Sequence, residues 1–154
     1  MIIDFNSMPE DARIWIYGSD MELSLDDQNS ITDILEVYLE NWEYHKNPIK
    51  SSVTILENHF IIIALDEKIS QIGGCSIDEL HRVMQTIEER FSISLFNRLN
   101  VFCKIKDVIK CFPVKTLKEV ANLDTLFFDL TIQKKMEIET FLKPIQNGWC
   151  SRYI

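Results

Sequence analysis

The segment IGGCSIDEL at residues 72–80 holds two of the chain's four glycines, followed by a thiol, a hydroxyl and two carboxylates. Ser76 and Glu79 have the S-x-x-E spacing of a capping box, which predicts a helix that begins just after Ser76. Backbone amides and the helix dipole stabilise negative charge at such a start, so they can raise the thiolate fraction of Cys75. Cys75 is therefore a candidate nucleophile, and free amides beside it could hold an oxyanion.

A second interpretation gives the same segment a purely structural role. Gly73 and Gly74 can supply positive φ for a tight corner, and free cysteine is among the most often buried residue types. On this interpretation Cys75 is packed away and unreactive. The sequence alone leaves both interpretations open.

His45 is the candidate base for a reactive Cys75, because it follows an apolar helical turn in the pattern Trp42-x-x-His45. It could instead interact with the negative C-terminal end of that helix. Asp66, at the end of an apolar strand, or Asp78 could orient the imidazole. A nucleophilic cysteine with such a base is typical of a cysteine-dependent hydrolase or transferase.

The elements that must position these residues follow from hydrophobic patterns. Residues 13–17 are β-branched and aromatic and end at a glycine, which predicts a strand. Ser24 is an expected N-cap, and apolar residues at helical spacing predict a helix from about Leu25 to Tyr44. Residues 52–57 and 60–65 predict a hairpin, and its second strand is apolar at every position, as expected for a strand buried on both faces.

The pattern continues with a helix over 77–91, strands over 101–105 and 108–112, and a short helix over 115–122. Further on we expect one more helix, broken near Pro144 and Gly148. The order β-α-β-β-α-β, with an added strand and C-terminal helices, is that of the ferredoxin-like α+β fold. We expect an antiparallel sheet with both long helices on one face, in a single domain over residues 1–154.

Alternating chain directions bring three ends to one edge of this fold: the end of the first helix, the end of strand 60–65 and the start of the second helix. We expect a site at this edge, with Trp42 as its apolar wall. The other residues expected there are His45, Asp66, Cys75, Ser76 and Asp78. This arrangement favours binding of a small ligand or a protein partner, and the cysteine-dependent enzyme is the alternative.

Composition argues against several classes of function. The net charge of −8 argues against general nucleic-acid binding, which depends on neutralising phosphates. No apolar run approaches the roughly 20 residues that cross a bilayer, and no basic region precedes an apolar stretch at the start, so we expect a cytoplasmic protein with no membrane partner. Four scattered cysteines and three histidines show no metal-ligand spacing, so we expect free thiols, no metal and no cofactor.

Charge is distributed unevenly along the chain. Residues 1–80 hold 16 acidic and 4 basic residues, whereas residues 81–154 hold 8 and 12. Solvated helix faces account for such a pattern. The alternative is electrostatic attraction between the two halves, within one molecule or in a homo-oligomer.

Several motifs together resemble a family of bacterial proteins of uncharacterised function. The most distinctive are Trp42-x-x-His45 and the sequence Gly-Cys-Ser-Ile-Asp at 74–78. The others are Met8-Pro9, Arg13-x-Trp15-Ile16-Tyr17, the strand over 60–66 and the closing Trp149-x-x-Arg152-Tyr153. The similarity spans nearly the whole chain and implies a shared fold and a shared edge site. Gly73 stands where the family usually has serine, and Glu79-Leu80 stands where small residues are usual.

Members of this family often carry the label "ABC transporter ATPase", which the present sequence does not support. It has no G-x-x-x-x-G-K-[ST] loop, whose backbone amides would cradle phosphates. We therefore expect no ATP hydrolysis, and the resemblance supplies no established activity to transfer.

Overall fold

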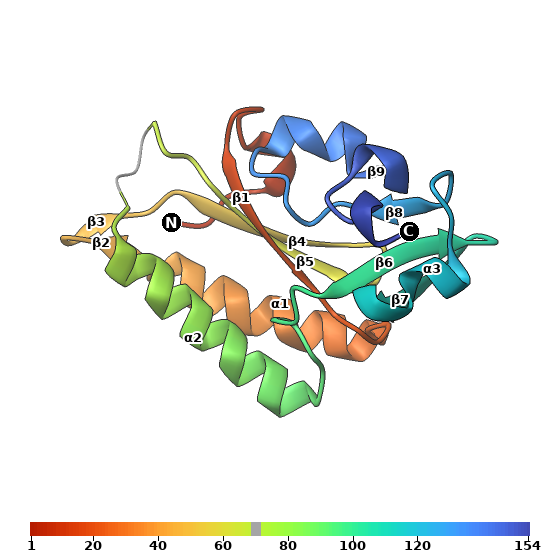
Figure 1. Ribbon diagram of the computed structural model, residues 1–154. Coiled ribbons are helices and arrows are strands. Elements are labelled where there is room, and N and C mark those ends of the chain that lie inside the picture. Colours follow the sequence, from red (N-terminus) through yellow and green to blue (C-terminus); the bar gives the residue numbers. More distant parts are fainter. Residues whose placement is uncertain (69–71) are drawn as a thin grey trace. The chain divides into compact units, whose positions relative to one another are not determined.

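The computed structural model describes residues 1–68 and 72–154 (Figure 1). Contacts between Cα atoms divide the chain into two compact units. The N-terminal unit comprises Met1–Leu95 and Gln133–Met136, and the C-terminal unit comprises Phe96–Ile132 and Glu137–Ile154. The single domain expected over residues 1–154 stays a prediction.

The N-terminal unit contains a three-stranded antiparallel sheet in the order β1-β5-β4. Its strands are β1 (Arg13–Gly18), β4 (Ser51–Leu56) and β5 (Phe60–Leu65). The central strand β5 is buried at all six positions, as its continuous apolar sequence predicts. The strand predicted over 13–17 and the hairpin predicted over 52–57 and 60–65 are therefore confirmed, with bounds that differ by one residue at most.

Two long helices, α1 (Leu25–Glu40) and α2 (Gly74–Phe91), lie on the same side of this sheet (Figure 1). Ser24 caps α1 as predicted, because its side chain accepts a hydrogen bond from the Asp27 amide at 3.1 Å. The interior of α2 is also as predicted, since Leu80, Met84 and Ile87 form its buried stripe.

The ends of both helices facing the expected site differ from the prediction. Helix α1 ends at Glu40 instead of Tyr44, because the chain turns into a short hairpin of β2 (Glu43–Tyr44) and β3 (Asn47–Pro48). Helix α2 begins at Gly74 with Gly73 as its N-cap, so the predicted capping box at Ser76 is wrong. Ser76 lies inside the first turn, where its hydroxyl bonds to the backbone of the hairpin instead.

The C-terminal unit contains a four-stranded antiparallel sheet in the order β7-β6-β8-β9. Its strands are β6 (Asn100–Ile105), β7 (Val108–Pro113), β8 (Leu126–Phe128) and β9 (Leu142–Pro144), with the short helix α3 (Leu117–Val120). Its 3₁₀ segments are Val114–Thr116, Ile145–Asn147 and Ser151–Tyr153; another, Lys135–Thr140, begins in the N-terminal unit and ends in this one, and Phe5–Ser7 belongs to the N-terminal unit. The core of this unit contains Val101, Cys103, Leu117, Phe127, Ile145 and Cys150.

The α+β class with antiparallel sheets is confirmed, but the predicted ferredoxin-like pairing is not formed among the described residues. Strand β6, expected to join the first sheet, pairs instead with β7 and β8. In place of one expected C-terminal helix, the tail contains 3₁₀ segments at Lys135–Thr140, Ile145–Asn147 and Ser151–Tyr153, with the expected breaks at Pro144 and Gly148. Residues 126–128 and 142–144, which were not expected to be strands, pair with each other. These strands have three residues each, shorter than the runs of four to eight that reveal a strand by its sequence pattern. No helix in the described part of the chain has the length and apolarity to cross a membrane.

Candidate functional site

The β2–β3 hairpin is joined to the first turn of α2 by two hydrogen bonds. Trp42, which is 1% exposed, donates from Nε1 to the carbonyl oxygen of Ser76 at 3.2 Å. The Ser76 hydroxyl donates in return to the carbonyl oxygen of Glu43 at 3.3 Å. We refer to Trp42, Glu43, Tyr44, Gly73 and Ser76 as the hairpin–helix junction. It brings the tryptophan corner and the double-glycine segment together, as the chain directions predicted.

The junction also explains why one of the two glycines is needed. A Cβ atom on Gly73 would lie 2.5 Å from Cε1 of Tyr44, so any side chain there would displace the ring. A Cβ atom on Gly74 would have nothing within 4 Å. Neither glycine has positive φ, so the predicted conformational reason is wrong and close approach of the Tyr44 ring replaces it at Gly73.

His45 is the first turn residue of the β2–β3 hairpin and does not cap α1. Both turn residues, His45 and Lys46, have positive φ (50° and 66°), and both are exposed. The His45 ring lies beside the Tyr44 ring, with 4.1 Å between the ring centroids. The two rings are tilted by 53° to one another, and because Tyr44 also packs against Gly73, this ring contact places His45 near the start of α2.

Cys75 is exposed, so of the two interpretations of its segment, the one that packs this side chain away is wrong. The first hydrogen bonds of α2 run from the amides of Ser76 and Ile77 to the carbonyl oxygen of Gly73, at 3.1 and 3.3 Å. The amides of Gly74 and Cys75 precede these bonds, and no side chain caps the helix. The first turn also has no acidic residue. The start of α2 therefore presents a thiol, backbone amides and the positive end of the helix dipole.

Two further predicted site residues are not part of the junction. Asp66 is buried, accepts a hydrogen bond from the Lys68 amide at 3.1 Å, and lies 4.0 Å from Lys50 Nζ. Asp78 is exposed on α2. Among the described residues, no hydrogen bond connects Cys75 with His45, Asp66 or Asp78, so the predicted catalytic set is not assembled by direct bonds.

Sequence reasoning missed Tyr44 and the hairpin that carries it. Two-residue hairpins usually have glycine, asparagine or aspartate in the turn, because both central residues need positive φ. Here the turn residues are His45 and Lys46; positive φ is uncommon for residues other than glycine, although histidine adopts it more often than most. The available signal was Asn47-Pro48, which favours an extended or turn conformation over continuation of the helix.

A second hydrogen bond, outside the junction, links α2 to the sheet. The Tyr17 hydroxyl of β1 lies 2.7 Å from Nδ1 of His81 on α2. Burial raises the pKa of Tyr17 well above its ordinary value, so the phenol stays neutral at physiological pH. This contact fixes the helix whose first turn belongs to the junction.

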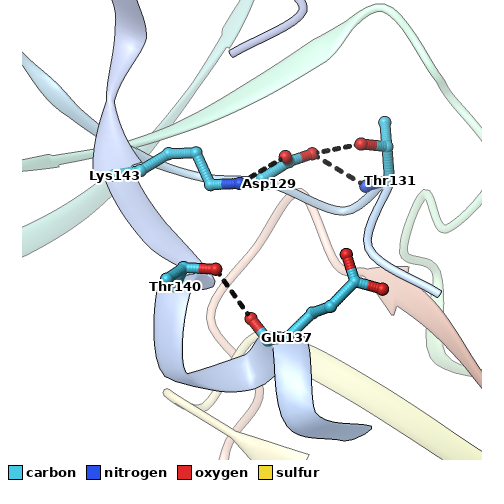
Figure 2. Close-up of polar contacts among 5 residues, drawn as sticks. All are labelled: Asp129, Thr131, Glu137, Thr140 and Lys143. Carbon is cyan, nitrogen blue, oxygen red and sulfur yellow. Dashed lines mark hydrogen bonds and ion pairs between the residues drawn. The ribbon is translucent and has the colours of Figure 1, made fainter. Parts of the chain in front are cut away.

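The C-terminal unit contains a different polar cluster around Asp129, shown in Figure 2. Lys143 Nζ lies 2.8 Å from Oδ2 of Asp129, while the amide and hydroxyl of Thr131 both donate to Oδ1. Burial alone would raise the pKa of Asp129, but the hydrogen bonds from Lys143 and Thr131 outweigh it and lower the pKa. In the same view, the Thr140 hydroxyl donates to the carbonyl oxygen of Glu137.

No group of three or more histidine, cysteine, aspartate or glutamate side chains in residues 1–68 and 72–154 is arranged to hold a metal ion. Comparisons with protein-family models, with curated proteins and with solved structures gave no match to this chain. The resemblance carried by Trp42-x-x-His45 and Gly-Cys-Ser-Ile-Asp therefore stays a prediction.

Proposed function

We propose that the hairpin–helix junction is a binding site for a small ligand or protein partner that presents a negatively charged group. The observation that carries this proposal is the hydrogen bond from Trp42 Nε1 to the Ser76 carbonyl. It fixes the hairpin on α2, so that the turn residues and the start of the helix form one continuous surface. A surface fixed in this way loses little conformational entropy when it binds a partner.

The helix start and Lys46 favour an anionic group at this surface, and they act against the exposed acids Glu43 and Asp78. The amides of Gly74 and Cys75, which have no acceptor among residues 1–68 and 72–154, lie at the positive end of an 18-residue helix, where backbone N–H groups and the dipole favour an anion. Lys46 is an exposed cation on the hairpin that packs against this end.

A cysteine-dependent hydrolase or transferase is the second candidate, favoured by the exposure of Cys75 at the start of α2. Such an enzyme needs a base within hydrogen-bond reach of the thiol. His45 makes no hydrogen bond to Cys75 among the described residues, so binding has the better support.

Titration with inorganic phosphate and with acetate, followed by ¹H–¹⁵N spectra, tests the binding proposal. We expect saturable shifts of the Gly74 and Cys75 amides at millimolar anion, weakened by Lys46→Ala. Lys106→Ala is the matched control, because Lys106 is also a positive-φ residue of a two-residue hairpin turn. Shifts that do not saturate, or that fall equally in both variants, contradict an anion site at the junction.

Alkylation by iodoacetamide as a function of pH separates binding from catalysis. In the native protein Cys75 should react first, because Cys103 and Cys150 are buried and burial raises the pKa of Cys103 to about 12. Fast reaction of Cys75 at pH 6 that is lost in His45→Ala would favour the cysteine-dependent enzyme. Reaction that follows exposure alone and is unaffected by His45→Ala favours a binding site.

A further inference from the structure

The outer edge of β4 is only partly covered. The Ser51 amide donates to the carbonyl oxygen of Met1 at 3.0 Å, and the Ile3 amide donates to the carbonyl oxygen of Ser51 at 2.9 Å. Both backbone groups of Ser51 therefore point away from β5. Because backbone groups alternate along a strand, those of Val53 and Ile55 point the same way. Among the described residues, no chain segment pairs with Val53 or Ile55 on this side.

The N-terminal segment leaves this edge after a single bridge between Ile2 and Ser51. It turns into the 3₁₀ segment Phe5–Ser7, which contacts β4 but makes no backbone hydrogen bond to Val53 or Ile55 among the described residues. The open part of β4 also lacks the usual protection of an edge strand, since Ser51–Leu56 contains no charge and no proline. By contrast, the edge strand β7 contains Lys110 and Pro113. Strand β4 can therefore accept a further strand.

A row of acidic side chains on α1 follows this edge. Glu40 Oε2 accepts a hydrogen bond from the Ile2 amide at 2.9 Å, which places Glu40 beside the segment paired to Ser51. Glu36 and Asp33 precede Glu40 by one and two turns on the same helix face, and all three are exposed.

The direction of α1 relative to β4 is given by the amino group of Met1. It donates to the carbonyls of Leu39 and Glu40 at the end of α1 and of Ile49 just before β4. Helix α1 packs against β4, so the acidic row leads from Glu40 back along the strand. Residues four apart on a helix are about 6 Å apart along its axis, close to the roughly 6.8 Å between alternate residues of a strand.

We propose that the outer edge of β4 binds an extended basic segment of a partner protein as an additional strand. The amides and carbonyls of Val53 and Ile55 would pair with its backbone, as in other cases of strand addition. Alternate lysine or arginine side chains of the segment would lie over Asp33, Glu36 and Glu40. This proposal is independent of the function proposed for the hairpin–helix junction.

Charge selects this occupant over a second copy of the chain. The N-terminal unit carries 18 acidic and 8 basic residues. Pairing β4 with β4 of another copy would bring two acidic rows together, and like-charge juxtaposition opposes association. A basic segment would neutralise the same row.

The test uses an acetylated, amidated heptapeptide of alternating lysine and valine, with a glutamate–valine peptide of the same length as control. In low salt we expect the basic peptide to shift the Val53 and Ile55 amides and to slow their hydrogen exchange. The glutamate peptide should do neither. Raising the salt to about 0.5 M should weaken binding at least about tenfold, because exposed charges are then screened beyond about 4 Å.

Matched variants separate the contributions of the backbone and the acidic row. Glu36→Lys should weaken binding at least about tenfold, whereas Glu89→Lys on α2 should have a small effect, since only the first charge lies beside the edge. A peptide N-methylated at alternate amides should bind weakly to the wild-type chain, because it cannot donate to β4. Ile55→Pro should remove the same pairing from the protein side.

Three results would overturn the proposal. The first is equal binding of the basic and N-methylated peptides, and the second is equal loss in Glu36→Lys and Glu89→Lys. The third is protection of the Val53 and Ile55 amides that rises with protein concentration without peptide, which would identify a second copy as the occupant.

Discussion

The hairpin–helix junction of the N-terminal unit and the Asp129 cluster of the C-terminal unit both link separate segments of the chain, but with different kinds of interaction. Each ties together segments that are distant in sequence: Trp42 and Ser76 are 34 residues apart, and Asp129 and Lys143 are 14 apart. The junction uses a neutral N–H···O=C hydrogen bond, donated by the buried indole of Trp42. The cluster uses a largely buried ion pair, with both oxygens of Asp129 occupied (Figure 2).

This difference shows which region has unused chemistry. Both carboxylate oxygens of Asp129 already accept hydrogen bonds, from Lys143 and Thr131, so we assign the cluster a structural role. At the junction the bonds use Trp42 and Ser76, whereas His45, Lys46 and Cys75 stay exposed around them. A rigid frame with exposed polar groups is the arrangement expected of a binding surface.

The largest effect should come from removing the indole at the junction. Trp42→Ala should lower the free energy of unfolding by about 3–5 kcal/mol, the usual cost of deleting a buried aromatic side chain. Trp42→Phe keeps most of the buried area and loses the hydrogen bond to Ser76, so its cost should be about 1–2 kcal/mol. Urea unfolding measures both.

Hydrogen exchange of the Ile77 amide gives this prediction a local readout. In Trp42→Phe the first turn of α2 should open more often than the middle of the helix. If exchange rises equally along α2, the bond from Trp42 does not fix the start of the helix, and the comparison with the Asp129 cluster fails.

The next largest effect concerns the ion pair. Asp129→Asn should destabilise the protein by about 2–3 kcal/mol, somewhat less than for a fully buried pair, because it leaves the Lys143 charge in a mostly buried position. The double variant Asp129→Leu/Lys143→Met should be less destabilised than the sum of its single changes. Additive losses in urea unfolding would show that the pair contributes no coupling.

The paired glycines provide a smaller and sharper comparison within the junction. Gly73→Ala should cost about 1–3 kcal/mol through overpacking, because its new methyl group would meet the Tyr44 ring. Gly74→Ala is the matched control and should be neutral or slightly stabilising, since alanine is the better helix former and the space is open. Equal effects of the two substitutions in thermal unfolding would contradict the close approach of Tyr44.

Much of the fold could be predicted where elements are long and periodic. The strand Phe60–Leu65, the cap at Ser24 and the stripe of Leu80, Met84 and Ile87 all agree with the structure. These features depend on local patterns that a single sequence displays. The meeting of Trp42 with the double-glycine segment could also be predicted, because it follows from chain direction alone.

The remaining features depend on contacts that leave little local signal. Ser76 has the spacing of a cap, yet it bonds to the carbonyl of Glu43, which is distant in sequence. The hairpin with His45 and Lys46 in its turn is held on α2 by contacts of Trp42, Glu43 and Tyr44, which the residue types of the turn do not reveal. Asp66 follows its strand as expected, but Lys50 and Lys68 engage its carboxylate away from the junction.

The smallest expected effect is the pH dependence of the Asp129 cluster. The folded-state pKa of Asp129 lies below its ordinary value because the hydrogen bonds from Lys143 and Thr131 outweigh the effect of burial. A carboxyl group with a depressed pKa contributes stability above its unfolded pKa of about 4 and loses it as pH falls through the folded pKa. Wild-type stability should therefore fall from pH 5 to pH 2 more steeply than that of Asp129→Asn.

Two other groups serve as controls. The pKa of Asp11 is lowered by its hydrogen bond from Lys68, so its contribution to the pH dependence of stability should be the same in wild type and Asp129→Asn. The hydrogen bond between Trp42 and Ser76 involves no group that titrates in this range. The free energy of unfolding of Trp42→Phe should therefore fall with pH in parallel with that of wild type. Identical slopes for all three proteins in acid unfolding curves would show that the ion pair is as insensitive to pH as the junction.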